Sequence, residues 1–69
     1  MKADLSPVPM LLRPTEAARA LELATQTLAN MRFKGIGPKW CKLGSAVRYS
    51  AEALREYCEA NTRTPGGGR

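Results

Sequence analysis

TQTLANMRFKGIGPKWCKLGSAVRY, residues 25–49, is the most informative segment of this 69-residue chain. All six acidic residues of the chain lie outside this segment, which contains five basic residues: Arg32, Lys34, Lys39, Lys42 and Arg48. A basic segment between segments of mixed charge is typical of a surface that meets a polyanion. Its period changes from helical before Gly35 to alternating after Pro38, which suggests a groove-binding helix beside a basic hairpin.

The size and composition of the chain predict one small globular domain. Its hydrophobic fraction of 43% is ordinary, and its formal net charge of +5 favours nucleic acid as a partner, with an anionic membrane second. No apolar run approaches the roughly 20 residues that span a bilayer. The N-terminal residues MKADLSPVPM do not form the apolar core of a signal peptide. We therefore expect a cytoplasmic protein without a membrane partner.

The residue types argue against catalytic and metal chemistry. The chain has no histidine, and Cys41 and Cys58 are too few and too far apart for a zinc cluster. We expect two small buried thiols in a reducing cytosol, with a disulfide between them as the alternative. No nucleophile–base pair or carboxylate pair stands out, so we expect no enzyme, no metal and no cofactor.

Residues 10–24 predict a short lead-in, a helix and a turn. Residues 10–12 form an apolar run that we expect to be extended or a small edge strand, after a disordered arm over residues 1–9. Pro14 suits the first position of a helix, where its missing N–H costs nothing. The helix should end near Leu21 or Glu22, and Leu23 should pack between the two helices as the apolar residue of the turn.

A second helix is expected from Thr25 to Lys34, with Gly35 ending it in a left-handed turn. Helical spacing places Leu28 and Met31 on its buried side. The opposite side carries Thr25, Gln26, Ala29, Asn30 and Phe33. Two helices joined by a turn of about three residues form a helix-turn-helix candidate, although a plain antiparallel helix pair is the alternative.

Residues 39–49 alternate like a β-hairpin whose tip is expected at residues 44–46. The alternation predicts an inner face of Cys41, Leu43, Val47 and Tyr49. It predicts an outer face of Trp40, Lys42 and Arg48. The outer face would carry Lys42 and Arg48 towards a phosphate backbone, and a strand face that meets only solvent is the alternative.

The last helix is expected to begin after Ser50, a natural N-cap, and to end near Ala60 or Asn61. Its residues Leu54, Tyr57 and Cys58 recur at helical spacing and should cover the inner face of the hairpin. Residues 62–69 contain one proline and three glycines and should form a flexible tail. The folded domain is therefore expected over residues 10–61.

The order of these motifs resembles a known family. LL-x-P-x-EAA, a short turn, TL-x-x-x-R and then G-x-GP-x-x-x-KLG-x-x-VRY-S-x-x-x-L are similar to the small MerR-like winged helix-turn-helix proteins. These include excisionases of phages and mobile elements, which are recombination directionality factors, and AlpA-type regulators. The resemblance covers about residues 11–59 and is most specific over residues 35–49. It implies a small α+β fold of three helices, with a two-stranded hairpin wing between the second and third.

The resemblance also implies which residues meet DNA. The second helix would enter the major groove and the wing would lie over the adjacent minor groove or backbone. With the basic residues of the central segment, the expected DNA-binding set is Thr25, Gln26, Thr27, Asn30, Arg32, Lys34, Lys39, Lys42, Ser45 and Arg48. The chain departs from the family at Glu22, where glycine is usual, and at Ala24, where serine or threonine is usual. Arginine or lysine is common where Asn30 and Phe33 stand.

The expected function is that of an excisionase. It would bind and bend double-stranded DNA near an attachment site and direct a site-specific recombinase, the integrase, towards excision. We expect copies to associate on DNA, with Phe33, Trp40, Glu56 and Glu59 available for contacts. An AlpA-type transcriptional regulator is the alternative with the same fold. A protein-interaction module is a further alternative, and insensitivity to salt would distinguish it from a DNA-binding protein.

Overall fold

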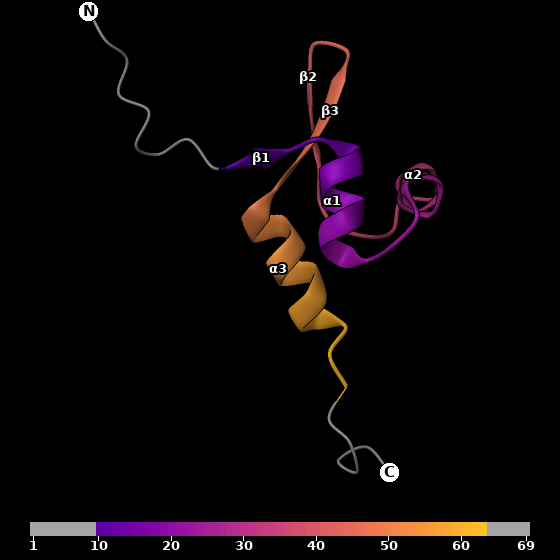
Figure 1. The fold of residues 1–69 in the computed structure, drawn as a ribbon, viewed down its shortest axis with the longest axis vertical. Helices are drawn as coiled ribbons and strands as arrows, with labels where there is room; N and C mark the ends of the chain where they lie inside the picture. Colours follow the sequence, from indigo (N-terminus) through magenta and orange to yellow (C-terminus); the bar gives the residue numbers. More distant parts are fainter. Residues whose placement is uncertain (1–9, 64–69) are drawn as a thin grey trace, which may run out of the picture.

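The computed structural model describes residues 10–63, which fold into three helices and a three-stranded antiparallel sheet (Figure 1). The elements in chain order are β1 (Leu11–Leu12), α1 (Pro14–Leu21), α2 (Thr25–Phe33), β2 (Cys41–Leu43), β3 (Ala46–Ser50) and α3 (Ala51–Ala60). The small α+β class and the three helices are as predicted. The expected arm at residues 1–9 and most of the expected tail, residues 64–69, lie outside the described residues.

Helix α1 begins at Pro14 as predicted and ends in a left-handed residue. Glu22 has φ 57° and ψ 41°. The Leu23 N–H donates to the Ala18 carbonyl at 2.8 Å and the Glu22 N–H donates to the Arg19 carbonyl at 3.0 Å, which together make a Schellman motif. Glycine is usual at this position because a Cβ is disfavoured there. Leu23 keeps 36% of its surface exposed, so it is not the buried plug that we expected.

Helix α2 ends in the same motif, with glycine at the left-handed position. Gly35 has φ 76°, its N–H donates to the Arg32 carbonyl at 3.1 Å, and the Ile36 N–H donates to the Met31 carbonyl at 2.9 Å. Leu28, at 1% exposure, is buried as predicted, and Met31 packs half-buried against the core. The helix begins at Thr25. Ala24, in the N-cap position, makes no side-chain hydrogen bond.

Helix α3 begins as predicted, with the Ala53 N–H donating to the Ser50 hydroxyl at 3.0 Å. Its C-terminal end is closed by side chains, since the Asn61 amide donates to the Tyr57 carbonyl at 2.8 Å and the Thr62 hydroxyl donates to the Cys58 carbonyl at 2.7 Å. The thiol of Cys58 is exposed, which contradicts the expectation of a buried cysteine on this helix. The buried residues of α3 are Ala53 and Leu54 in its first turn, and Cys58 lies one turn further along the helix.

The register of the hairpin differs from the prediction. The pairs are Cys41 with Arg48, Lys42 with Val47 and Leu43 with Ala46, so the turn contains only Gly44 and Ser45. Gly44 has φ 65°, which suits the first central position of a type II′ turn. Paired residues share a face, so Cys41 and Leu43 lie with Arg48, and Lys42 lies with Val47 and Tyr49. The predicted common outer face of Lys42 and Arg48 is therefore wrong, because a one-residue change in the turn moves a strand's side chains to the other face.

Strand β1 completes the sheet on the other side of β3. It pairs Leu11 with Ser50 and Leu12 with Tyr49 in antiparallel register, which gives the strand order β1-β3-β2. The Ala51 N–H extends this pairing by donating to the Met10 carbonyl at 3.0 Å. The edge-strand alternative for residues 10–12 is thus confirmed, and the sheet has one strand more than the predicted hairpin.

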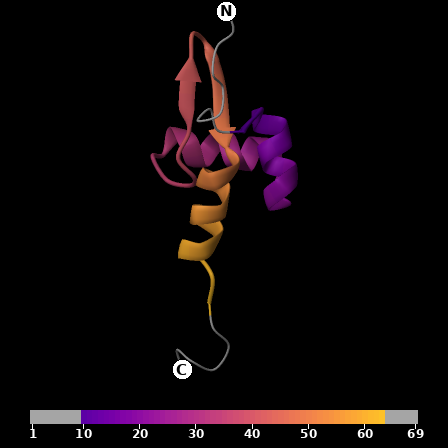
Figure 2. The same ribbon diagram turned by 90° about the vertical axis from the view of Figure 1, so that its left-hand side faces the viewer.

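The core lies where side chains of the three helices meet β3. Its buried cluster consists of Ala17, Ala18, Leu28, Tyr49 and Leu54. The two alanines allow α1 to approach its neighbours closely, and α2 lies across α1 (Figures 1 and 2). The β2–β3 hairpin extends away from the helices in both views. The small core thus fixes the positions of α2 and of the β2–β3 hairpin.

The unequal caps of α2 and α3 permit a paired prediction of stability. Ser50→Ala removes the hydroxyl that accepts from Ala53, and we expect it to lower the free energy of unfolding by about 1 kcal/mol. Ala24→Ser supplies the missing acceptor at the start of α2 and should raise it by a similar amount. Urea unfolding followed by circular dichroism measures both changes. A loss of stability in Ala24→Ser would show that the N-terminus of α2 does not accept this cap.

Candidate nucleic-acid interface

The exposed face of α2 carries a hydrogen-bonded pair of amides. The Gln26 Nε2 donates to the Asn30 Oδ1 at 2.9 Å, and both side chains are exposed. Phe33 follows on the same face at the i+7 position from Gln26 and is 78% exposed. Thr25 and Thr27 are exposed on either side of this line. The face therefore offers amide donors and acceptors with one aromatic ring at its end.

Exposed lysines occur at the end of α2, before β2 and on β2. Lys34, Lys39 and Lys42 are exposed, and within residues 10–63 the two salt bridges both belong to Arg55. Arg55 pairs with Glu52 at 3.9 Å and with Glu59 at 3.1 Å on α3. Glu52 and Glu59 therefore pair within their own helix, and within the described residues no salt bridge joins α3 to the lysines of the central segment.

Arg32 is turned into the fold. Its Nη1 donates to the Tyr49 hydroxyl at 2.9 Å, and its guanidinium carbon lies 5.4 Å from the ring centroid of Phe33 and 5.7 Å from that of Trp40. These contacts connect α2 with β3 and with the loop that leads into β2. The side chain is half-buried. Its contacts show a structural role, and a DNA contact by Arg32 stays a prediction.

The hairpin presents cations on both of its faces. Lys42 is exposed on the face of Val47, and Arg48 is half-buried on the other face, where its Nη1 donates to the Val47 carbonyl at 2.7 Å. Ser45 is exposed in the turn between them. A flat surface could therefore meet only one of the two cations, whereas a groove with two walls could meet both.

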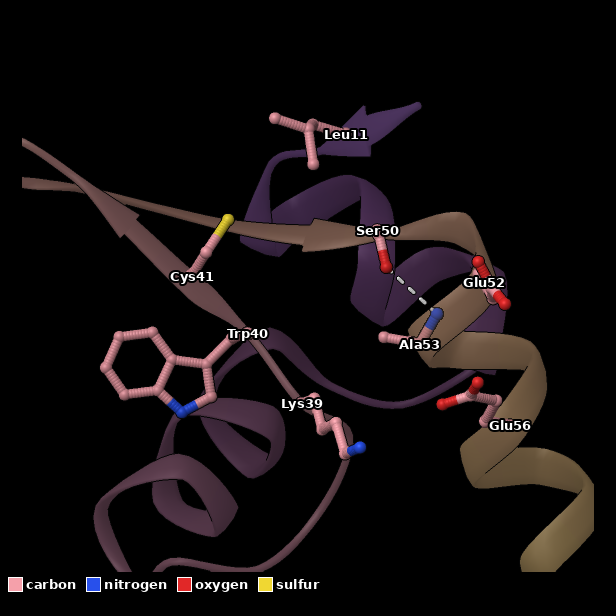
Figure 3. A pocket seen from close by; sticks show the side chains of 8 residues that line it. All are labelled: Leu11, Lys39, Trp40, Cys41, Ser50, Glu52, Ala53 and Glu56. Carbon is pink, nitrogen blue, oxygen red and sulfur yellow. Dashed lines mark hydrogen bonds between the residues drawn. The ribbon is translucent and has the colours of Figure 1, made fainter. Parts of the chain in front are cut away.

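A groove of ≈ 390 Å³ between the start of β2 and α3 holds the last of the predicted site residues (Figure 3). Lys39 lines the groove together with Glu52 and Glu56. Its charge therefore lies beside two carboxylates and not among basic residues alone, as the sequence predicted. Cys41 also lines the groove and is exposed and free, as is Cys58. The predicted burial of both thiols is wrong, and they form no disulfide.

The expected site residues therefore form two groups, with three residues outside them. Thr25, Gln26, Thr27 and Asn30 share the exposed side of α2, and Lys42, Ser45 and Arg48 share the hairpin. Lys34 is exposed where α2 ends. Arg32 and Lys39 lie apart from these groups, one against Tyr49 and one beside α3.

Comparison with known proteins does not assign the chain to a family. No protein-family model matches it, and neither does any curated protein sequence. None of the helices within residues 10–63 combines the length and the apolar character that crossing a bilayer requires. Inferences about function therefore rest on the residues and their geometry.

Phe33 and Trp40 are the residues whose place the sequence left open. Phe33 is 78% exposed and Trp40 is 43% exposed, so neither belongs to the core. A periodicity argument alone identifies Phe33 as surface, because it falls on the face opposite Leu28. The alternation of residues 39–49 predicted an outward position for Trp40, and it is exposed in the irregular segment that precedes β2.

Proposed function

We propose that this chain is a winged helix-turn-helix DNA-binding protein, with α2 as the helix that enters the major groove and the β2–β3 hairpin as the wing. The observation that supports this most is the exposed face of α2, where Gln26 and Asn30 are paired within a segment that has no acidic residue. Amide side chains in this setting make paired hydrogen bonds with adenine. The three-residue connection between α1 and α2 agrees with this assignment.

Within that fold class, we propose an excisionase-like role. The protein would bind repeated sites beside an attachment site, associate with further copies on the DNA, and bend the duplex so that an integrase favours excision. One helix and one wing form an interface at the small end of specific complexes, about 600–1,000 Å². Several adjacent copies would raise the affinity beyond that of one domain.

A footprint on the DNA that flanks the gene for this protein tests the proposal. Protected direct repeats near an attachment site support the excisionase role. Loss of excision by the integrase when the protein is omitted supports it further. Protection confined to a promoter, with excision unchanged, supports an AlpA-type transcriptional regulator. Absence of protection on any duplex contradicts DNA binding itself.

The hairpin gives a prediction about the salt dependence of binding. Because Lys42 and Arg48 lie on opposite faces, we expect the hairpin to contact phosphates with both of its faces. Lys42→Ala and Arg48→Ala should each reduce the slope of log K against log salt by about one unit and weaken all sequences alike. Mobility-shift titrations at several salt concentrations measure the slope.

Arg55→Ala is the matched control for the wing variants. It removes the same charge, but from the face of α3 where Glu52 and Glu59 already pair with it. Its slope should equal that of the unmodified protein. A reduced slope in only one of the two wing variants would mean that the hairpin lies flat on the DNA. An unchanged slope in both would mean that the hairpin is not part of the DNA interface.

A further inference from the structure

Phe33 is the most exposed of the large apolar side chains on the helices. It is 78% exposed, and it lies on the same side of α2 as Gln26 and Asn30, seven and three residues after them. The guanidinium of Arg32, fixed by the Tyr49 hydroxyl, lies over its ring at 5.4 Å. The ring is therefore supported from the protein side and presented outwards beside the amide pair.

A polar groove offers few groups that a phenyl ring can contact favourably. In the major groove of DNA, the apolar group presented by the bases is the C5-methyl of thymine, which phenylalanine contacts in direct readout. The rise of a helix places Phe33 about 4.5 Å along α2 from Asn30, comparable with a base-pair step of about 3.4 Å. A thymine near the adenine read by the amides lies within its reach.

We propose that Phe33 reads the methyl group of a thymine next to the base pair that Gln26 and Asn30 contact. This inference rests on the proposed DNA-binding function and deepens it, since it assigns an A·T-containing element to the target. The helix face carries it: the ring shares a line with the two amides, and Lys34 follows it with an exposed charge. If Phe33 belonged to a protein interface, we would expect the apolar surface of α2 to continue into Ile36. Ile36 instead lies beyond Gly35 and off the helix.

The test removes the methyl group from the DNA and the ring from the protein. A duplex selected from a randomised pool at fixed salt is prepared with thymine and with deoxyuridine at each thymine position. The unmodified protein should bind the deoxyuridine duplex about fourfold more weakly at the position read by Phe33. Phe33→Ala should bind both duplexes equally, because the contact no longer exists on either.

Two further variants control for folding and for general apolar loss. Phe33→Leu keeps an apolar contact and should retain part of the preference for thymine. Ile36→Ala removes another exposed apolar side chain, 56% exposed and outside α2, and should keep the full preference. Circular dichroism should show a folded domain for all three variants, and melting of the Phe33 variants should fall only by the small contribution of the contact with Arg32.

The outcomes separate this inference from the function on which it rests. If Phe33→Ala retains the same preference for thymine as the unmodified protein, the inference is wrong and DNA binding stands. If Phe33→Ala and Ile36→Ala both lose cooperative loading while that preference stays, the ring belongs to a contact between copies. If the unmodified protein binds no duplex, the proposed function and the inference both fail.

Discussion

Replacement of Tyr49 by alanine is expected to leave the chain largely unfolded at room temperature. Tyr49 is 1% exposed and is, with Leu28, one of the largest fully buried side chains in the described domain. Truncation of a buried aromatic residue costs about 3–5 kcal/mol. A domain of this size holds only about 0.05–0.15 kcal/mol per residue in total, so this loss removes most of its stability.

Tyr49→Phe separates the ring from its hydroxyl. The hydroxyl accepts from the Arg32 guanidinium at 2.9 Å, and a hydrogen bond to a charged group contributes about 1.5–3 kcal/mol. We expect the lower end of that range because the contact is only part-buried. Arg32→Met should cost a similar amount, and the double variant should cost less than the sum of the two, because both changes break the same bond.

Denaturant unfolding followed by circular dichroism measures these variants. Tyr57→Ala is the matched control, since Tyr57 is a half-buried tyrosine on α3 that lies outside the core cluster. It should lose clearly less stability than Tyr49→Ala. Equal losses in the two alanine variants would show that Tyr49 does not hold the core together.

The second large effect concerns sequence-specific binding by α2. Gln26→Ala or Asn30→Ala should each cost about 1–3 kcal/mol on the selected site and little on random DNA. Because the two side chains are hydrogen-bonded to each other at 2.9 Å, the double variant should lose less than the sum of the single losses. Competition titrations with selected and random duplexes of equal length provide both numbers.

Thr27→Ala serves as the control for this pair. Thr27 is exposed on the flank of the same helix and should affect both duplexes alike, as a contact to the backbone would. If Gln26→Ala and Asn30→Ala lose equal affinity for selected and random DNA, those residues also contact only the DNA backbone. The target sequence would then have to be read elsewhere.

The helix boundaries could be predicted because local residues determine them. Pro14 begins α1, Ser50 caps α3 and Gly35 ends α2, and each acts through its own backbone geometry or side chain. The exposed position of Gln26 and Asn30 followed from helical spacing for the same reason. These signals act over three or four residues, so no knowledge of the rest of the fold is needed to interpret them.

The register of the hairpin could not be predicted in the same way. GSA between two apolar runs suits a turn of two or three residues, and the choice decides whether Lys42 and Arg48 share a face. The pairing of Leu43 with Ala46 reveals the two-residue turn. The local sequence pattern does not indicate the length of the turn, because Ala46 fits a turn and a strand equally well.

The inward position of Arg32 escaped prediction for a different reason. Its partner Tyr49 lies 17 residues away, and charge patterning treats every cation of the segment alike. The prediction of a buried Cys41 failed with the register, because Cys41 pairs with Arg48 on the face opposite Tyr49. Cys58 lies beyond the first turn of α3, which holds the buried residues of that helix. Long-range packing determined these outcomes.

Strand β1 has a consequence for how the molecule forms on the ribosome. It is the first described element to be synthesised, yet its partner β3 is among the last. The β2–β3 hairpin closes over a short loop and can form quickly, whereas β1 must wait for a strand on the far side of two helices. Folding during synthesis is therefore expected to remain incomplete until residues up to Ser50 have emerged. The backbone amide of Ala51, which donates to Met10, should accordingly be among the first to exchange with solvent when the native state opens.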